Sequence, residues 1–368
     1  MPLIQNARKF LSSVDPLGFI PVKRSNPNPE LKIVFLGAGV VGGSVGAWVA
    51  QNYNHAYFLD QGEVAKALKT KGITTYLGDK PDEKTNVQVN VIDKLEETAD
   101  ADVVVIGVKN YSLEAVAKMV RKKMGDRPII VAMQNGLDNQ RILPKYFSKV
   151  IYCVVSYNAW IDESGHIGYQ KKGPLHFGTL QNELMTEMED ITAIFNLGVE
   201  THITHQIADA AHCKLVINLT NSLTTLIGMG FRPISDSALF QKLLTNLTWE
   251  GVKIIKAAGF KEVSLGGMPP WALLWSGAML PRTLTKRMFE RNVKKMVISS
   301  MAQDLIQRGG KDSELESING YILGLAEKHN VPAPYNKAVY ELAKQEFPKP
   351  KFETLDVAKV WEYVKSRL

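Results

Sequence analysis

Short apolar runs alternate with amphipathic stretches over the first half of the chain, from Leu31 to about Leu180. Four of these runs have the length of strands, and two of the four, 103–108 and 129–133, are continuously apolar, as strands buried on both faces of a parallel sheet usually are. The four runs cover residues 32–36, 56–59, 103–108 and 129–133. Helical patterns lie between or after them, at 42–51, 112–124 and 138–146. This alternation predicts a Rossmann-type α/β domain, to which short glycine-punctuated strands near 166–177 add an antiparallel part.

The periodicity becomes helical after about His205. Helices are predicted, with no convincing strand among them, at 207–229, 237–258, 284–307, 314–330 and 356–368. A chain of 368 residues is expected to hold two domains, since a domain usually has about 150 residues. We therefore predict a dinucleotide-binding Rossmann domain over 31–205 and an all-α substrate and catalytic domain over 206–368. Residues 1–30, rich in proline, are predicted to be an irregular N-terminal extension.

Composition excludes several other classes of protein. Hydrophobic residues make up 45% and charged residues 22%, which is ordinary for a globular chain. No apolar run reaches the roughly 20 residues of a membrane helix, and no signal-peptide core is present. The two cysteines cannot form a disulfide scaffold, and His202-x-x-His205 is too isolated for a metal site. We expect a cytoplasmic protein with no membrane partner and no metal.

Positive charge is concentrated between Arg282 and Lys295, although the net charge of the whole chain is only +7. Its helical spacing is typical of the solvated face of an amphipathic helix, and the same cations could instead attract an anionic ligand toward a cleft. No aromatic interleaving and no recognisable binding motif accompany them. We therefore expect no nucleic-acid partner.

A glycine turn, Gly37-Ala38-Gly39-Val40-Val41-Gly42, follows the first strand and opens the first helix. In such a turn Gly37 allows the tight bend, Gly39 lets the backbone approach a pyrophosphate, and Gly42 lets helix and strand pack closely. Asp60 ends the second strand, where a carboxylate can accept both ribose hydroxyls. Because this carboxylate repels a 2′-phosphate and Gln61 rather than arginine follows it, NAD(H) is favoured over NADP(H).

A line of polar residues runs along one face of the otherwise apolar segment 207–229. Lys214, Asn218, Asn221 and Thr225 are spaced at i, i+4, i+7 and i+11. The line is either an ordinary wet face or the wall of a polar cleft. The line has one charged residue, Lys214, among short amide and hydroxyl side chains. This combination is suited to orient the carbonyl and the carboxylate of a ligand.

A second candidate segment begins at Ser313. Ser313 and Glu316 have the spacing of a helix-capping box, which gives Glu316 a structural role. Glu314 has no such role, so it either complements the helix dipole or reaches a ligand hydroxyl.

From about Lys32 to Leu342 the order of motifs resembles the ketopantoate reductase family (2-dehydropantoate 2-reductases). The motifs are Gly37-x-Gly39-x-x-Gly42, Val108-Lys109, Gln134-Asn135-Gly136-Leu137, Lys214-Leu215-x-x-Asn218, Ser299-Ser300-Met301, Glu314-x-Glu316-x-Ile318-Asn319-Gly320 and Val331-Pro332-x-Pro334-x-Asn336. The resemblance implies an oxidoreductase of pantothenate biosynthesis that transfers a hydride from NAD(P)H to the ketone of 2-dehydropantoate, giving pantoate.

The resemblance also implies a role for each matching residue. Lys214 would be the general acid toward the carbonyl oxygen. The substrate would be bound by Asn218, Asn221, Ser300 (carboxylate) and Glu314 (terminal hydroxyl), and Lys109 and Asn135 would lie beside the cofactor.

Several features depart from the family pattern, among them a Ser300-to-Glu314 interval about two residues longer than usual. The second asparagine of the lysine helix is expected about eight residues after Lys214, whereas Asn221 stands at +7 and Ser222 at +8, and either could face the cleft. Residues 264–285 form an apolar insertion that could line the cleft for a bulkier substrate, or pack at the surface or at a subunit contact, so a homodimer stays open. Asp60-Gln61 also departs from the family's usual NADPH preference.

Two alternatives to 2-dehydropantoate reduction therefore remain. One is a related NAD-dependent dehydrogenase acting on another 2-keto acid or an opine-like substrate. The other is a dinucleotide-binding regulator without catalytic activity.

Overall fold

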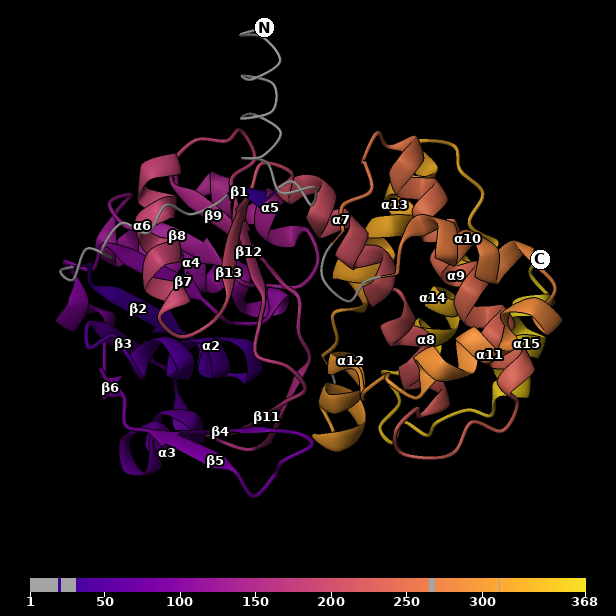
Figure 1. The fold of residues 1–368 in the computed structure, drawn as a ribbon, viewed down its shortest axis with the longest axis horizontal. Coiled ribbons are helices and arrows are strands. Elements are labelled where there is room, and N and C mark those ends of the chain that lie inside the picture. The colour runs from indigo at the N-terminus through magenta and orange to yellow at the C-terminus, as the bar shows by residue number, and fades with distance from the viewer. Residues whose placement is uncertain (1–18, 21–30, 265–268, 311) are drawn as a thin grey trace, which may run out of the picture. The chain divides into compact units, whose positions relative to one another are not determined.

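The computed structural model describes residues 19–20, 31–264, 269–310 and 312–368. The chain divides into two compact units, Met1–Ala208 and Asp209–Leu368. Figure 1 shows strands and helices mixed in the first unit and helices in the second. The prediction of a Rossmann-type α/β part followed by an all-α part is confirmed.

The first unit contains a nine-stranded sheet of order β1-β13-β12-β9-β8-β7-β2-β3-β6. From β9 to β6 every neighbouring pair is parallel, whereas β12 runs antiparallel to β9. The strands are β1 (Phe19–Ile20), β2 (Ile33–Leu36), β3 (Ala56–Leu59), β6 (Asn90–Val91), β7 (Val103–Ile106), β8 (Ile129–Ala132), β9 (Val150–Val155), β12 (Leu175–Gly178) and β13 (Thr201–Thr204).

A second sheet of order β10-β11-β4-β5 also belongs to this unit. It comprises β4 (Ile73–Leu77), β5 (Lys84–Val87), β10 (Ala159–Glu163) and β11 (His166–Tyr169). The predicted antiparallel addition is present as the β10–β11 pair, but β11 also runs parallel to β4.

Helices connect the parallel strands, as the alternating pattern predicted. They are α2 (Val40–Ala50), α3 (Gly62–Lys71), η1 (Leu95–Thr98), α4 (Asn110–Met124), α5 (Asp138–Ile142), η2 (Leu143–Lys145) and α6 (Met185–Asn196). Helix α2 packs on β2, β3 and α6, while α4 packs on α5 and η1.

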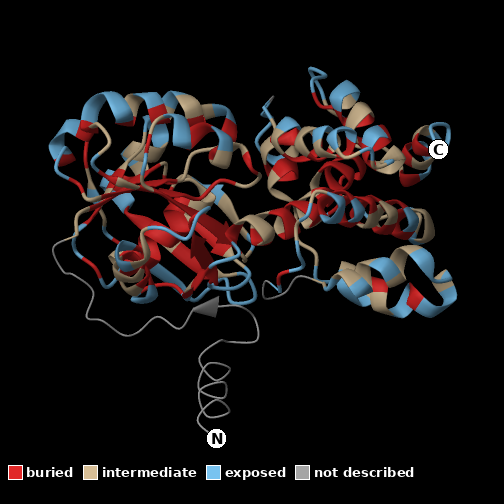
Figure 2. Cartoon of the chain, turned by 90° about the horizontal axis from the view of Figure 1, so that it is seen from above, coloured by how far each residue is buried: buried red, intermediate tan, exposed pale blue. Residues whose placement is uncertain are grey.

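The centre of the main sheet is buried on both faces. Every residue of β2 and β7 is buried, and Figure 2 shows the strands of this unit between helices whose outer sides are exposed. Phe35 of β2 stacks on Phe58 of β3 with ring centroids 5.1 Å apart, and Phe195 of α6 lies 6.1 Å from Phe35. Burial on both faces is the reason that these strands are apolar throughout rather than alternating.

Seven of the described strands lie where the sequence predicted none: β1, β4, β5, β6, β9, β10 and β13. β1 falls inside the predicted irregular extension and pairs with β13, which itself lies near the predicted domain junction. The two residues of β1 are joined to the sheet by backbone hydrogen bonds, and so short a strand has no detectable hydrophobic period.

The second unit contains helices and no extended strand among its described residues. Its longest helix, α9 (Ser237–Ala257), packs against α8, α10, α13, α14 and α15. The other helices from the unit boundary onward are α7 (Ile207–Asn218), α8 (Thr220–Ile227), α10 (Trp271–Met279), α11 (Arg282–Val293), α12 (Ser300–Ala302), α13 (Tyr321–Lys328), α14 (Pro334–Glu346) and α15 (Val357–Lys365). Two π-helical turns are η3 (Gln303–Gln307) and η4 (Glu316–Gly320). Across the described residues, no helix has the length and hydropathy that a membrane crossing requires.

Two segments predicted as single helices are divided at short polar side chains. Segment 207–229 divides at Leu219, where Thr220 Oγ1 donates to the Ile217 carbonyl at 2.7 Å. Segment 284–307 divides before Ser299, whose hydroxyl accepts a hydrogen bond from Ala302 N at the start of α12. Such side chains offer the backbone alternative partners, which apolar periodicity does not reveal. Helices α10 and α14 were missed because the proline-bounded segments around them resemble loops.

A buried carboxylate holds the start of α14 against α9. Glu250 is 4% exposed, and its oxygens accept hydrogen bonds from Tyr335 N at 3.1 Å, Asn336 N at 2.9 Å and Asn336 Nδ2 at 3.0 Å. Burial raises the pKa of Glu250, and the N–H donors of Asn336 and Tyr335 oppose that rise. Pro334 needs no hydrogen-bond acceptor because it has no backbone N–H, which makes it well suited to the first helical position. The Pro334-x-Asn336 motif therefore has a structural role here.

Replacing Glu250 by alanine should destabilise the second unit strongly. The change leaves buried N–H donors of Tyr335 and Asn336 without their acceptor, at about 1–3 kcal/mol for each unsatisfied group. We expect the free energy of unfolding, measured by urea denaturation with circular dichroism, to fall by about 3 kcal/mol. Glu327→Ala, at an exposed position of α13, is the control and should change it by less than about 0.5 kcal/mol. Equal effects of the two variants would refute the role of Glu250.

Candidate functional site

The residues predicted to bind the cofactor follow four adjacent strands of the main sheet. The glycine turn follows β2, Asp60 follows β3, Lys109 follows β7 and Asn135 follows β8. These strands are neighbours in the order β8-β7-β2-β3 and are parallel, so their carboxyl ends meet at one edge. The chain passes from β2 to its neighbour β3 on one side and from β7 to its neighbour β8 on the other side. The direction of the connections therefore reverses between β2 and β7, and ligands of open α/β sheets bind where such a reversal occurs.

The three glycines of the turn have three different environments. Gly37 has a φ of +89°, which an L side chain rarely adopts. A Cβ on Gly42 would lie 2.0 Å from the Gly37 carbonyl oxygen, whereas a Cβ on Gly39 would meet nothing within 4 Å. Gly37 and Gly42 are thus required by the fold, and Gly39 leaves open space at the start of α2.

The other members of the turn complete a helix N-terminus without a side-chain cap. Ala38 is buried, Val40 and Val41 are half-buried, and α2 begins at Val40 with Gly39 as its N-cap. Because no side chain caps the first N–H groups of α2, this end of the helix favours an anionic ligand.

Asp60 is bonded to the turn itself. Its Oδ2 accepts a hydrogen bond from Ala38 N at 2.6 Å, and its Oδ1 accepts one from Gln61 N at 2.7 Å. The carboxylate therefore positions the glycine turn in addition to any contact with a ligand. Among the nearby lysines, Lys69 forms an ion pair with Asp93, while Lys66 is exposed.

Two further residues support this edge: Gly107, which was not predicted, and Gln134, which lies in one of the family motifs without an assigned role. A Cβ on Gly107, directly after β7, would lie 2.7 Å from the Gly37 carbonyl oxygen. The close approach of the turn to β7 therefore also requires a glycine at position 107. Gln134 is buried, and its Nε2 donates to the Ile106 carbonyl at 2.6 Å. The position of a glycine directly after an apolar strand was the only signal in the sequence for Gly107.

Lys109 and Asn135 are positioned by their backbones. Lys109 is the N-cap residue of α4, and the Asn135 carbonyl accepts a hydrogen bond from Asn110 Nδ2 at 2.6 Å. Both side chains are half-buried. Asn110 thus ties the end of β8 to the start of α4.

The polar line of the second unit divides into two parts. Lys214, Asn218 and Asn221 are half-buried on α7 and α8. Asn218 Nδ2 is buried and has no hydrogen-bond partner among the described residues. Thr225 is fully buried and shares a hydrogen bond of 3.2 Å with Ser299 Oγ, so it belongs to the core and not to an open polar face.

Asn221 and Ser222 differ in burial. Ser222 is 0% exposed and accepts a hydrogen bond from Asn319 Nδ2 at 3.0 Å. It therefore serves the packing of η4 on α8. Of the two residues, Asn221 is the one left to contact a ligand.

Helix α8 is hydrogen-bonded to residues near the two remaining substrate candidates in the sequence. Thr225 bonds to Ser299, directly before Ser300, which is half-buried at the start of α12. Ser222 bonds to Asn319 in η4, the turn that begins two residues after Glu314. The cofactor candidates thus belong to the first unit, and the substrate candidates belong to the second.

The capping-box prediction at Ser313 is wrong in its second half. Ser313 Oγ accepts from Leu315 N at 3.4 Å, but Glu316 is exposed and accepts hydrogen bonds from the Tyr340 hydroxyl at 2.8 and 2.7 Å. Glu316 also forms an ion pair with Lys344. The wide turn of η4 carries Glu316 away from the position that a capping α-helix would give it. Glu314, in contrast, is 4% exposed, and a carboxylate is rarely buried so deeply without a specific role.

Metal ligands do not gather in the described part of the chain, where no three His, Cys, Asp or Glu side chains are placed to hold an ion. His202 contacts Glu200, and His205 contacts Asn182. Both cysteines, Cys153 and Cys213, are buried, and neither forms a disulfide.

Comparison with known proteins agrees with the motifs. The family model for ketopantoate reductase PanE/ApbA matches residues 33–182, and that for the C-terminal part of the same reductase matches residues 206–346. The chain belongs to the ketopantoate reductase family. The prediction of an oxidoreductase of this family is confirmed.

Curated relatives match over nearly their whole length. The chain is 24% identical over 315 residues to 2-dehydropantoate 2-reductase of Archaeoglobus fulgidus, covering 85% of this chain and 97% of that protein. It is 26% identical over 318 residues to the uncharacterized oxidoreductase YkpB of Bacillus subtilis, covering 84% and 97%.

Solved structures share the fold. A ternary complex of D-mandelate dehydrogenase with NADH and anilino(oxo)acetate matches with a TM-score of 0.70 and 17% identity, covering 88% of this chain and 100% of that chain. The 2-dehydropantoate 2-reductase of Geobacter metallireducens matches with a TM-score of 0.70 and 20% identity, covering 86% and 99%.

Alanine substitutions at two glycines of the turn should differ sharply in their effect on stability. Gly42→Ala places a methyl group 2.0 Å from a backbone oxygen and should lower the free energy of unfolding by about 3 kcal/mol. Gly39→Ala meets no atom within 4 Å and has a φ of −67°, so the free energy should change by less than about 1 kcal/mol. Chemical denaturation of the two variants measures the difference. A Gly39→Ala variant as unstable as Gly42→Ala would contradict this description of the turn.

Proposed function

We propose that the protein reduces the ketone of a 2-keto acid with hydride from a nicotinamide dinucleotide, and that 2-dehydropantoate, which gives pantoate, is a substrate. The observation that carries the proposal is the match of a ketopantoate reductase model to each part of a chain that retains Lys214, Asn218 and the glycine turn. Relatives from Archaeoglobus fulgidus and Pyrococcus abyssi carry the name 2-dehydropantoate 2-reductase, which supports this substrate.

The residues at the carboxyl edge of the sheet fit a dinucleotide. The open space at Gly39 and the uncapped N-terminus of α2 suit a pyrophosphate. Each oxygen of Asp60 accepts one backbone hydrogen bond, which leaves lone pairs for ribose hydroxyls. Lys109 and Asn135 are proposed to hold the remainder of the cofactor, which supplies the hydride when bound. The negative charge of Asp60 favours NADH over NADPH.

Lys214 is the proposed general acid. A ketone that accepts a hydride develops negative charge on its oxygen, and an ammonium group stabilises that charge and donates the proton. Asn218 is proposed to donate to a substrate oxygen, because its buried Nδ2 has no hydrogen-bond acceptor among the described residues. Asn221, Ser300 and Glu314 are proposed to bind the rest of the substrate, with Ser300 at the carboxylate and Glu314 at the terminal hydroxyl.

The proposal is tested by incubating the purified protein with a panel of 2-keto acids and measuring the oxidation of NADH and of NADPH. Turnover of 2-dehydropantoate supports it. Reduction of another 2-keto acid alone would favour the related-dehydrogenase alternative, and dinucleotide binding without any turnover would favour the regulator.

Lys214→Ala should abolish most turnover while preserving cofactor binding. Loss of a positioned general acid costs about 100- to 10,000-fold in rate, so we expect kcat to fall by at least about 100-fold. The dissociation constant of NADH, measured by fluorescence titration, should change less than threefold. Lys256→Ala, at an exposed position of α9, is the control and should retain full activity. An equal loss of NADH binding and turnover would contradict the role of Lys214.

Cofactor preference should change when the charge of Asp60 is removed without removing its hydrogen bond. In the double variant Asp60→Asn with Gln61→Arg, the new amide keeps an oxygen that can accept from Ala38 N, and arginine attracts the 2′-phosphate. We expect the NADPH/NADH ratio of kcat/KM to rise at least tenfold. An unchanged ratio would show that this turn does not select the cofactor.

A further inference from the structure

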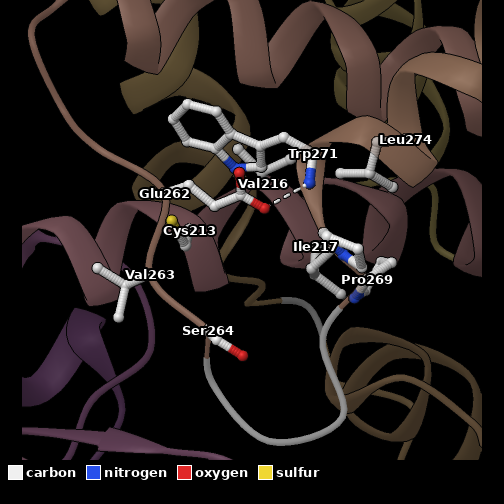
Figure 3. Close-up of a pocket in the computed structure, with 10 residues that line it drawn as sticks. Cys213, Val216, Ile217, Glu262, Val263, Ser264, Pro269, Trp271 and Leu274 are labelled. Carbon is white, nitrogen blue, oxygen red and sulfur yellow. Dashed lines mark hydrogen bonds between the residues drawn. The ribbon is translucent and has the colours of Figure 1, made fainter. Parts of the chain in front are cut away.

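A cavity of about 130 Å³ is lined by residues of α7, by residues 262–264 and 269–270, and by residues of α10. Figure 3 shows Cys213 and Ile217 of α7 on one side of it, and Trp271 and Leu274 of α10 on another. The lining residues of α10 belong to the apolar insertion 264–285. Trp271 and Leu274 of the insertion thus line the same cavity as residues of the helix that carries Lys214.

The cavity adjoins the polar face of α7 around the helix. At about 100° per residue, Ile217 projects about 60° from Lys214 on one side, and Asn218 about 40° on the other. Cys213 lies about 40° beyond Ile217 in the same direction. Cys213 and Ile217, which line the cavity, thus lie beside the polar face of α7 that carries Lys214 and Asn218.

The chemistry of the lining selects a neutral apolar group. The described residues that line the cavity include no lysine or arginine. Burial raises the pKa of the Cys213 thiol to about 11, so the thiol is uncharged at neutral pH, and it donates to the Lys261 carbonyl. Glu262 is engaged in the wall, where it accepts a hydrogen bond from Trp271 N at 2.7 Å (Figure 3).

The composition of α10 indicates the same preference. Eight of its nine residues are apolar or glycine, yet none of them is buried. A helix that is apolar on all sides normally lies in a core. The half-exposed Trp271 and Leu274 have contact area left for an apolar ligand.

The volume indicates the size of that group. A dry cavity of about 150 Å³ is large enough to bind benzene. A cavity of about 130 Å³ therefore accepts one group of nearly that size.

We infer that this cavity receives the apolar side chain of a 2-keto acid, and that the protein accepts 2-keto acids with a branched or aromatic side chain as large as a phenyl ring. The inference rests on the proposed reduction of a 2-keto acid. It adds Trp271, Leu274 and Ile217 as residues that determine the size of the substrate.

Steady-state kinetics with phenylpyruvate and pyruvate test the inference on the full-length protein. We expect the wild type to reduce phenylpyruvate with a kcat/KM at least tenfold above that for pyruvate. Leu274→Trp fills the cavity and should lower kcat/KM for phenylpyruvate at least tenfold, with less than a twofold change for pyruvate. Met279→Trp places the same ring on the exposed end of α10 and is the matched control, with no change expected for either substrate.

A second variant keeps the test decisive if Leu274→Trp does not fold. Leu274→Ala enlarges the cavity and should raise kcat/KM for the larger indole-3-pyruvate relative to phenylpyruvate. Equal wild-type kcat/KM for pyruvate and phenylpyruvate, or equal losses for both in Leu274→Trp, would overturn the inference and leave the proposed function intact. A wild type that reduces neither these compounds nor 2-dehydropantoate, with either nicotinamide cofactor, would overturn both.

Discussion

Gly37, Gly42 and Gly107 bring three backbone segments so close together that a methyl group on Gly42 or Gly107 would lie within 2.7 Å of the Gly37 carbonyl oxygen. This contact fixes the ends of β2 and β7 and the start of α2 relative to one another. The position of Ala38 N, and through it that of Asp60, follows from the same contact. The dinucleotide-binding edge of the sheet depends on the absence of side chains at these positions.

Polar contacts have a comparable role among the helices of the second unit. Helix α8 is bonded to α12 through Thr225 and Ser299 and to η4 through Ser222 and Asn319. Glu250 fixes the start of α14 on α9. Buried hydrogen bonds are specific in direction, so they define which faces of these helices meet, whereas apolar packing alone would tolerate other arrangements.

Much of this architecture was predictable from the sequence, and the exceptions have physical reasons. Strands buried on both faces, such as Val103–Ile106, are visible as apolar runs, and the glycine turn has a fixed spacing. The role of Thr225 was not visible, because helical spacing shows which residues share a face but not what that face contacts. The exposure of Glu316 depends on a π-helical turn, which has no counterpart in sequence periodicity.

The double engagement of Asp60 limits how cofactor use can diverge among relatives of this chain. One carboxylate serves both as the proposed discriminator of ribose from phosphoribose and as a hydrogen-bond acceptor for the backbone of the turn. A single replacement that removes the oxygen acceptor would alter the turn before any new specificity was gained. Gln61 bonds to Asp60 through its backbone N–H, which every residue except proline supplies. A preference for a phosphorylated cofactor can therefore evolve by substitution of residue 61, as long as residue 60 keeps an oxygen that accepts a hydrogen bond.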